Sequence, residues 1–232
     1  MKYFKMNRDI PNQVHTDIKR TLWGAFGYVY EYRKPFAKAL FFPVSILVAL
    51  GVLSVQEPSS VLMVFLVILP WVIYTVLAIT IHRIILLGPN SVSEWGVYTP
   101  GKREAYFILH SIALSLFMIP FGFISVIPAI GWIISMLAII YLMARLSLVF
   151  PAIATDQSWA FSDSWKATKN HQALMMVVVA IFPFVISIPE RLLSNVPYAG
   201  GFVNLLSALT LVFVVSALSV AFKLIAESSE ES

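Results

Sequence analysis

The residues of this sequence that could do chemistry are a few ionisable side chains beside long apolar stretches. They are His82, Arg83, His110, Arg145, Glu190 and Arg191. A charge at the middle of a bilayer is costly, so a charge placed there would indicate a proton or ion pathway. Each of these side chains instead lies within a helical turn or two of the end of its stretch, where long side chains reach the headgroups. Their positions argue against an ion-coupled transporter.

The histidines predict no metal site. His15, His82, His110 and His171 are scattered, and no two are spaced to lie on one helical face as ligands. The chain has no cysteine, which excludes thiolate zinc sites and disulfides. It also has no glycine-rich phosphate loop and no recognisable hydrolase motif. We therefore expect no cofactor, no metal and no identifiable catalytic residue.

Four prolines fall inside apolar stretches, at Pro43, Pro70, Pro120 and Pro183. Each removes a backbone hydrogen bond and tends to kink a helix, so kinked helices could line a cavity or a gate. Proline is also commoner in membrane helices than in soluble ones, and this plainer interpretation stays beside the first.

The elements that position these residues are six predicted transmembrane helices. With 232 residues, 59% hydrophobic and 12% charged, the chain differs strongly from soluble domains. Its apolar stretches, each long enough to cross a bilayer, cover residues 36–55, 61–87, 105–126, 129–150, 173–188 and 201–224. The fold class is therefore an all-α polytopic membrane protein. A polar break at 56–60 predicts a hairpin between the first two spans.

Charge sets the orientation. Lys and Arg near span ends stay in the cytoplasm, and six spans place every cation except Arg191 on one side. Both termini should then be cytoplasmic. We expect a cytoplasmic segment over 1–35, a transmembrane domain over 36–224 and an acidic cytoplasmic tail over 225–232.

Two amphipathic segments should flank the spans. Residues 16–32 have apolar side chains at helical spacing, which would lie on one face of a helix. They are Ile18, Leu22, Ala25, Phe26 and Val29. We expect a helix on the cytoplasmic membrane surface or, equally, a helix that packs on the protein's own loops. A second short helix is expected over 158–171.

The cations predict the binding partner. Although the net charge is +4, its one-sided distribution favours anionic lipid headgroups over nucleic acid. The candidate contacts are Lys19, Arg20, Arg33, Lys34, Arg83, Arg145, Lys166 and Lys169. For Arg145 we expect a structural or lipid-phosphate contact, with an ion pair to Asp156 as the alternative. Protein partners and oligomeric state are not predicted.

Three stretches carry a resemblance to a known group. They are residues 23–36, residues 81–88, and a pattern made of Arg145, Pro151, Asp156, Ala160, Ser164 and Thr168. Together they resemble the YciC-like membrane proteins and the membrane domain attached to some glycerophosphodiester phosphodiesterases. The resemblance implies a six-helix bacterial inner-membrane protein. It does not imply phosphodiesterase activity, because the catalytic domain is absent from this sequence. Asn170 and His171 stand where the group often has a glycine.

Three hypotheses follow. The first is a non-enzymatic scaffold or lipid-interacting protein of the bacterial inner membrane. The second is a transporter or lipid-handling permease whose proline-kinked helices line a cavity. The third is an intramembrane enzyme, for which Asp156 and Glu190 are the residues to test.

Overall fold

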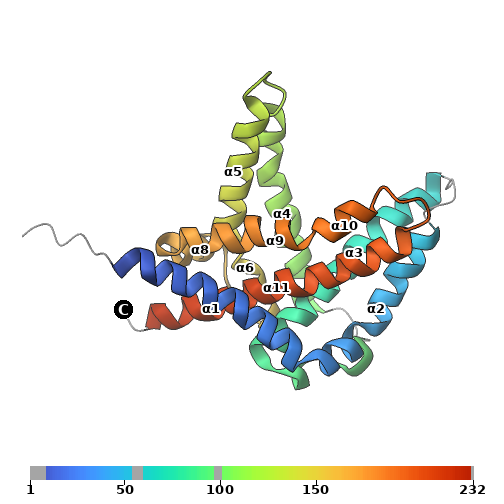
Figure 1. Ribbon diagram of the computed structural model, residues 1–232, viewed down its shortest axis with the longest axis horizontal. Helices are drawn as coiled ribbons and strands as arrows, with labels where there is room; N and C mark the ends of the chain where they lie inside the picture. The colour runs from blue at the N-terminus through green and yellow to red at the C-terminus, as the bar shows by residue number, and fades with distance from the viewer. Residues whose placement is uncertain (1–8, 54–59, 97–100, 231–232) are drawn as a thin grey trace, which may run out of the picture.

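The computed structural model describes residues 9–53, 60–96 and 101–230, and within these ranges the chain is helical without a strand (Figure 1). Six helical stretches are long and apolar enough to cross a membrane. They are Arg33–Leu53, Leu66–Leu87, Lys102–Ile124, Gly131–Ala154, Gln172–Leu193 and Gly200–Ser228. The predicted all-α polytopic fold and its six spans are confirmed. The predicted turn at 56–60 lies mostly outside the described residues.

Helix α11 (Gly200–Glu230) is the element on which most other helices pack. Its 31 residues extend about 46 Å. Ala208, Val212 and Val215 in its first half join a core cluster with α2 (Arg33–Leu53) and α3 (Ser60–Leu87). Its second half packs on α1 (Asp9–Glu31), with which it lies side by side (Figure 1). The helix thus includes most of the segment predicted as a tail.

The apolar stripe of α1 is covered by the protein's own helices. Ala25 is fully buried, and Ile18 and Leu22 pack against the cluster formed with α11 and α8 (Gln172–Met176). We expected this stripe to face either the membrane surface or the protein's own loops. It faces the protein, but helices and not loops cover it. Trp23 and Tyr30 remain exposed, at 69% and 71%.

The contact between α2 and α11 depends on three glycines. A Cβ atom on Gly51 would lie 2.4 Å from the carbonyl oxygen of Gly200, and one on Gly200 would lie 2.3 Å from that of Gly51. Gly201 lies against the side chain of Val52. One turn further along α11, Asn204 Nδ2 donates to the carbonyl of Leu47 at 2.7 Å. Small residues let membrane helices approach this closely.

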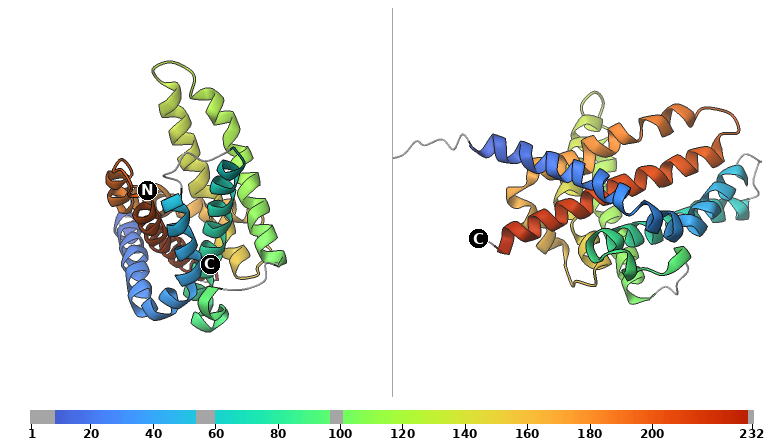
Figure 2. Two further views of the ribbon diagram at one scale, coloured as in Figure 1. Left: turned by 90° about the vertical axis from the view of Figure 1, so that its right-hand side faces the viewer. Right: turned by 60° about the horizontal axis from the view of Figure 1, so that its bottom comes forward.

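Helices α4 (Lys102–Ile124) and α5 (Gly131–Leu146) form a hairpin that projects from the other helices (Figures 1 and 2). Leu116, Phe123 and Trp132 on this hairpin are more than half exposed, as expected of side chains that face lipid. The base of the hairpin packs on α3, on α6 (Val149–Ala154), on α7 (Phe161–Ala167) and on α8.

The remaining elements are short. The fifth span consists of α8, a π-helical turn at Val177–Ile181, α9 (Phe182–Ile186) and α10 (Ile188–Leu193). Pro183 has no N–H to donate. The π-helical turn, which is wider than an α-helical turn, ends two residues before this proline. The second short helix expected over 158–171 is present as α7 (Phe161–Ala167), followed by a 3-10 turn at Thr168–Asn170. Two further 3-10 turns, Pro89–Ser91 and Glu94–Gly96, follow α3.

The glycine contact yields a first prediction. Gly51→Ala should destabilise the protein by about 1–3 kcal/mol, because the methyl group would meet backbone atoms and force α2 and α11 apart. Thermal unfolding in mild detergent, followed by tryptophan fluorescence, measures the effect. Gly122→Ala on α4 is the matched control, since nothing lies within 4 Å of its Cβ position. Equal melting temperatures for the two variants would contradict the role given to Gly51.

Candidate functional site

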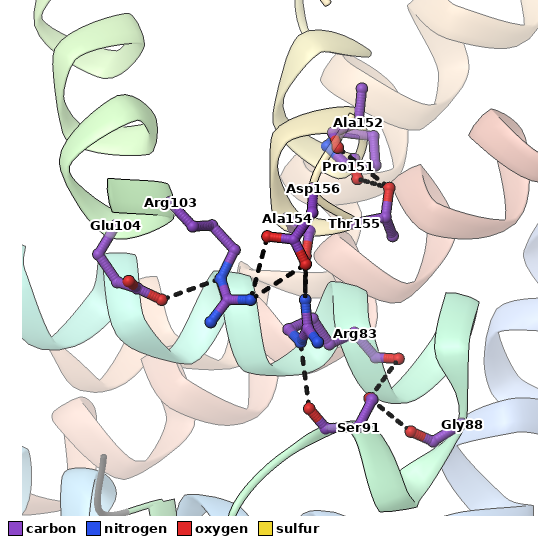
Figure 3. Close-up of polar contacts among 10 residues, drawn as sticks. All are labelled: Arg83, Gly88, Ser91, Arg103, Glu104, Pro151, Ala152, Ala154, Thr155 and Asp156. Carbon is purple, nitrogen blue, oxygen red and sulfur yellow. Dashed lines mark hydrogen bonds and ion pairs between the residues drawn. The ribbon is translucent and has the colours of Figure 1, made fainter. Parts of the chain in front are cut away.

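Three helix ends meet in a polar cluster at the base of the hairpin (Figure 3). Arg83 comes from the last turns of α3, Arg103 from the first turn of α4, and Asp156 from the residues directly after α6. Asp156 lies between the two arginines. Its carboxylate is 2.7 Å from Nη1 of Arg83 and 3.3 Å from Nη1 of Arg103. The cluster therefore joins the end of α3 and the start of α4 to the end of α6, which lies more than 50 residues further along the chain.

The end of α6 aims the Asp156 side chain. Asp156 has the left-handed backbone conformation, with φ of 64°. Its N–H donates to the carbonyl of Ile153 at 3.0 Å, and the N–H of Gln157 donates to that of Ala152 at 2.9 Å. This pair of bonds is the Schellman helix ending, in which glycine is the usual residue at the left-handed position. Aspartate tolerates that conformation better than most residues, and here it adds a carboxylate beside two arginines.

Arg83 is committed to contacts within the protein. Besides Asp156, its Nη1 donates to the carbonyl of Ala154 at 2.9 Å, and its Nε donates to that of Ser91 at 3.2 Å. The Ala154 carbonyl belongs to the C-terminal end of α6, where the helix dipole favours a cation. The Arg83 side chain is 15% exposed. Arg83, a candidate for headgroup contact, therefore directs these donors at groups of the protein itself.

Arg103 and Glu104 complete the cluster. Nε of Arg103 lies 3.0 Å from the Glu104 carboxylate, whose other oxygen accepts the Gly101 N–H at 2.7 Å. Sequence reasoning did not select either residue. The spacing of Glu104 three residues after Gly101 was an available signal, because an acidic side chain there caps a helix start. Two arginines and two carboxylates balance, so the cluster offers no net charge to a ligand.

Arg145 forms a separate buried contact with α7. It is 3% exposed, its guanidinium lies 4.5 Å from the ring centre of Trp165, and Nη2 donates to the Trp165 carbonyl. Nε and Nη1 are buried without a hydrogen-bond partner among the described residues. The C-terminal ends of α5 and α7 meet here, and both helix dipoles favour a cation. Of the environments expected for Arg145, this is the structural contact, and Asp156 pairs with other arginines.

The residues of the family-like pattern have structural roles in these two places. Ser164 and Thr168 lie one turn apart on α7 and its continuation, and both hydroxyls donate to the carbonyl of Arg145, at 2.8 and 3.3 Å. Ala160 precedes α7, and its N–H donates to the Asp163 carboxylate at 2.9 Å. Pro151 is buried in α6. The pattern therefore describes how α7 is attached to α5 and how α6 ends.

The other six candidate cations are exposed. They are Lys19, Arg20, Arg33, Lys34, Lys166 and Lys169. None of them forms an ion pair with an acidic side chain within the described residues. Lys38, which is also exposed, lies 3.7 Å from Glu94. The structure thus separates cations that hold helices together from cations that are open to solvent or headgroups.

A cavity of about 500 Å³ lies beside the polar cluster. Lys102, Arg103, Tyr106 and His110 from α4 line one side of it, and the segment from Asp156 to Ala160 lines the other. His110 Nδ1 is 2.9 Å from the carbonyl of Tyr106, so this nitrogen is a donor and the ring is held in place. The lining thus combines the charges of Lys102, Arg103 and Asp156 with hydrogen-bonding side chains.

Two histidines outside this cluster lie beside serine hydroxyl groups. His82 is buried, and its Nδ1 lies 2.8 Å from the hydroxyl of Ser219 on α11. His171 Nε2 lies 3.3 Å from the hydroxyl of Ser228. In the part of the chain that the structure describes, no three His, Asp or Glu side chains are grouped as metal ligands.

Comparison with models of protein families, with curated proteins and with solved structures finds no match.

The ion-pair cluster yields a second prediction. Asp156→Asn keeps the size and the left-handed conformation but removes the charge that Arg83 and Arg103 share. Because the Asp156 side chain is 56% exposed, we expect a loss of only about 1 kcal/mol. The melting temperature of the unaltered protein should be lower at high salt than at low salt, because salt screens the ion pairs. The melting temperature of the variant should depend less on salt.

The matched control is Glu94→Gln, which removes an ion pair whose side chains are 56% and 75% exposed. It should leave both the stability and its salt dependence unchanged. An Asp156→Asn variant that behaved like this control would show that the cluster does not stabilise the hairpin base.

Proposed function

We propose that this multi-pass membrane protein engages anionic lipid headgroups through its exposed cations, as a lipid-interacting or scaffolding protein of the bacterial inner membrane. One observation carries the proposal. The exposed cations lie on α1, at the start of α2 and on α7 with its continuation, which an even number of spans places on one side of the membrane. Each cation near an anionic surface contributes about 1 kcal/mol to binding.

The burial of Arg83 and Arg145 sharpens this proposal. Both are positively charged, yet each guanidinium contacts groups of the protein itself. These groups are backbone carbonyls, the Trp165 ring and the Asp156 carboxylate. Lipid contact is therefore assigned to the exposed set alone. Membership of the YciC-like group also remains a proposal, supported by the attachment of α7 to α5 through Arg145, Ser164 and Thr168.

The alternative function is a permease with proline-kinked helices. Among the four span prolines, Pro120 lines a cavity, which has a volume of about 480 Å³ and lies between α4, α5 and α7. Its lining is mostly aromatic and aliphatic, including Phe117, Phe161 and Trp165. An apolar lining at this position suits contact with lipid tails better than passage of a polar solute.

The proposed function yields a third prediction. A variant with Lys19, Arg20, Lys166 and Lys169 all changed to Gln should lose at least about tenfold of its preference for phosphatidylglycerol over phosphatidylcholine. Native mass spectrometry of the purified chain with both lipids offered equally measures the preference. Lys38→Gln is the control, because Lys38 already pairs with Glu94. An unaltered protein that binds both lipids equally would overturn the proposal.

The orientation yields a fourth prediction. Since the sequence has no cysteine, one introduced thiol reports its own side of the membrane. Glu227→Cys, near the end of α11, should react with a membrane-impermeant maleimide only after spheroplasts are lysed. Ser194→Cys, between α10 and α11, should react in intact spheroplasts. The reverse pattern, or equal labelling, would contradict cytoplasmic termini.

A further inference from the structure

A long apolar groove runs along α2 where this helix faces α11. It has a volume of about 560 Å³. From α2 it is lined by residues spaced one turn apart, and from α11 by Leu205, Ala208, Leu209 and Val212. Phe41 and Leu209 are 53% and 48% exposed, so the groove opens sideways towards the surroundings of the spans. In a bilayer these surroundings are lipid tails.

The groove has the length of a phospholipid in one leaflet. Its lining on α2 begins at Arg33 and ends at Val48, a distance of about 22 Å along the helix. One leaflet is about 20–22 Å thick when its headgroup region is included. A chain that starts at the Arg33 end would therefore remain in the groove through its own leaflet.

Arg33 is the one charged side chain among the described residues of the lining, and it lies at the end of the groove where α2 begins. Its Nη1 donates to the carbonyl of Tyr30 at 2.8 Å, and its guanidinium lies 4.5 Å from the centre of the Tyr30 ring. These contacts hold the side chain, and among the described residues no partner takes up Nε and Nη2. Two parallel N–H groups of one guanidinium bind a phosphate in a bidentate manner.

We infer that this groove holds one acyl chain of an anionic phospholipid whose phosphate lies against Arg33. Charge complementarity at one end, an apolar lining along the rest and a length that matches one leaflet point to the same occupant. The inference rests on the proposed function, but it concerns a specific site and not the general attraction of a cationic surface. A tail in a bilayer gains little by moving from lipid to protein, so the headgroup contact and the fit of the groove supply the preference.

The test uses phosphatidylglycerol with a photoreactive diazirine near the end of one acyl chain, added to the full chain in nanodiscs. After illumination and digestion, the crosslinks should map to the α2 and α11 peptides that line the groove. Ser45→Trp, which fills the groove about 18 Å beyond Arg33, should reduce these crosslinks at least about fivefold. Ser115→Trp is the matched control, since Ser115 is an exposed serine on α4 outside the groove.

A second pair of variants tests the headgroup contact. Arg33→Gln should reduce the groove crosslinks about fivefold, whereas Lys38→Gln, whose side chain lines a different pocket and pairs with Glu94, should leave them unchanged. Equal losses for both variants would show a general surface attraction, which overturns the site and leaves the proposed function standing. Equal crosslinking by phosphatidylcholine would overturn the headgroup assignment.

Two further outcomes also overturn the inference. Crosslinks spread evenly over α4 and α2 would show that tails only surround the protein. A change of oligomeric state in Ser45→Trp, seen by native mass spectrometry, would show that a helix of a second copy occupies the groove. Because the variants of the third prediction keep Arg33 and Ser45 intact, a failure of the groove can be told apart from a failure of the proposed function.

Discussion

Gly51 and Gly200 bring the backbones of α2 and α11 into direct contact, and most other helices are arranged about this pair. Lipid tails are as apolar as leucine side chains, so helices in a membrane are not driven together by the hydrophobic effect. Close packing and a few polar contacts must do so. Here the glycines provide the close approach and Asn204 adds a hydrogen bond to Leu47. Once α11 is placed, α1, α3 and α8 have a surface to pack on.

The polar contacts between elements are concentrated at helix ends. Asp156 lies directly after α6, Arg103 lies in the first turn of α4, and Arg145 lies in the last turn of α5. Helix ends are where unpaired carbonyl and N–H groups need partners and where the helix dipole favours a charge. They also lie near the headgroups, where a charged side chain costs least. The same positions that could serve a binding site therefore attach the hairpin and α7 to the remaining helices.

The division between committed and exposed cations connects the fold with the proposed function. Arg83 and Arg145 hold helices together, whereas Arg33 and the lysines of α1 and α7 are exposed. Arg33 differs from the other exposed cations because it lies at the end of an apolar groove. Its guanidinium is oriented by Tyr30, whereas lysines act as flexible point charges. Under our proposals, the lysines supply a general attraction to anionic headgroups, and Arg33 binds the phosphate of one specific lipid.

The sequence by itself determined the membrane class, the number of spans and the presence of a short helix between the fourth and fifth spans. Runs of about 20 apolar residues have few alternatives to a membrane helix, because hydrocarbon leaves no other partner for the backbone. Arg145, Ser164 and Thr168, which belong to one family-like pattern in the sequence, also contact one another in the structure. Tertiary structure alone decided that Asp156 pairs with Arg83 and Arg103, that Arg145 is buried, and that α11 covers the stripe of α1. These outcomes depend on which helix ends meet in space, and the hydrophobicity of a segment does not predict which other segment it will contact.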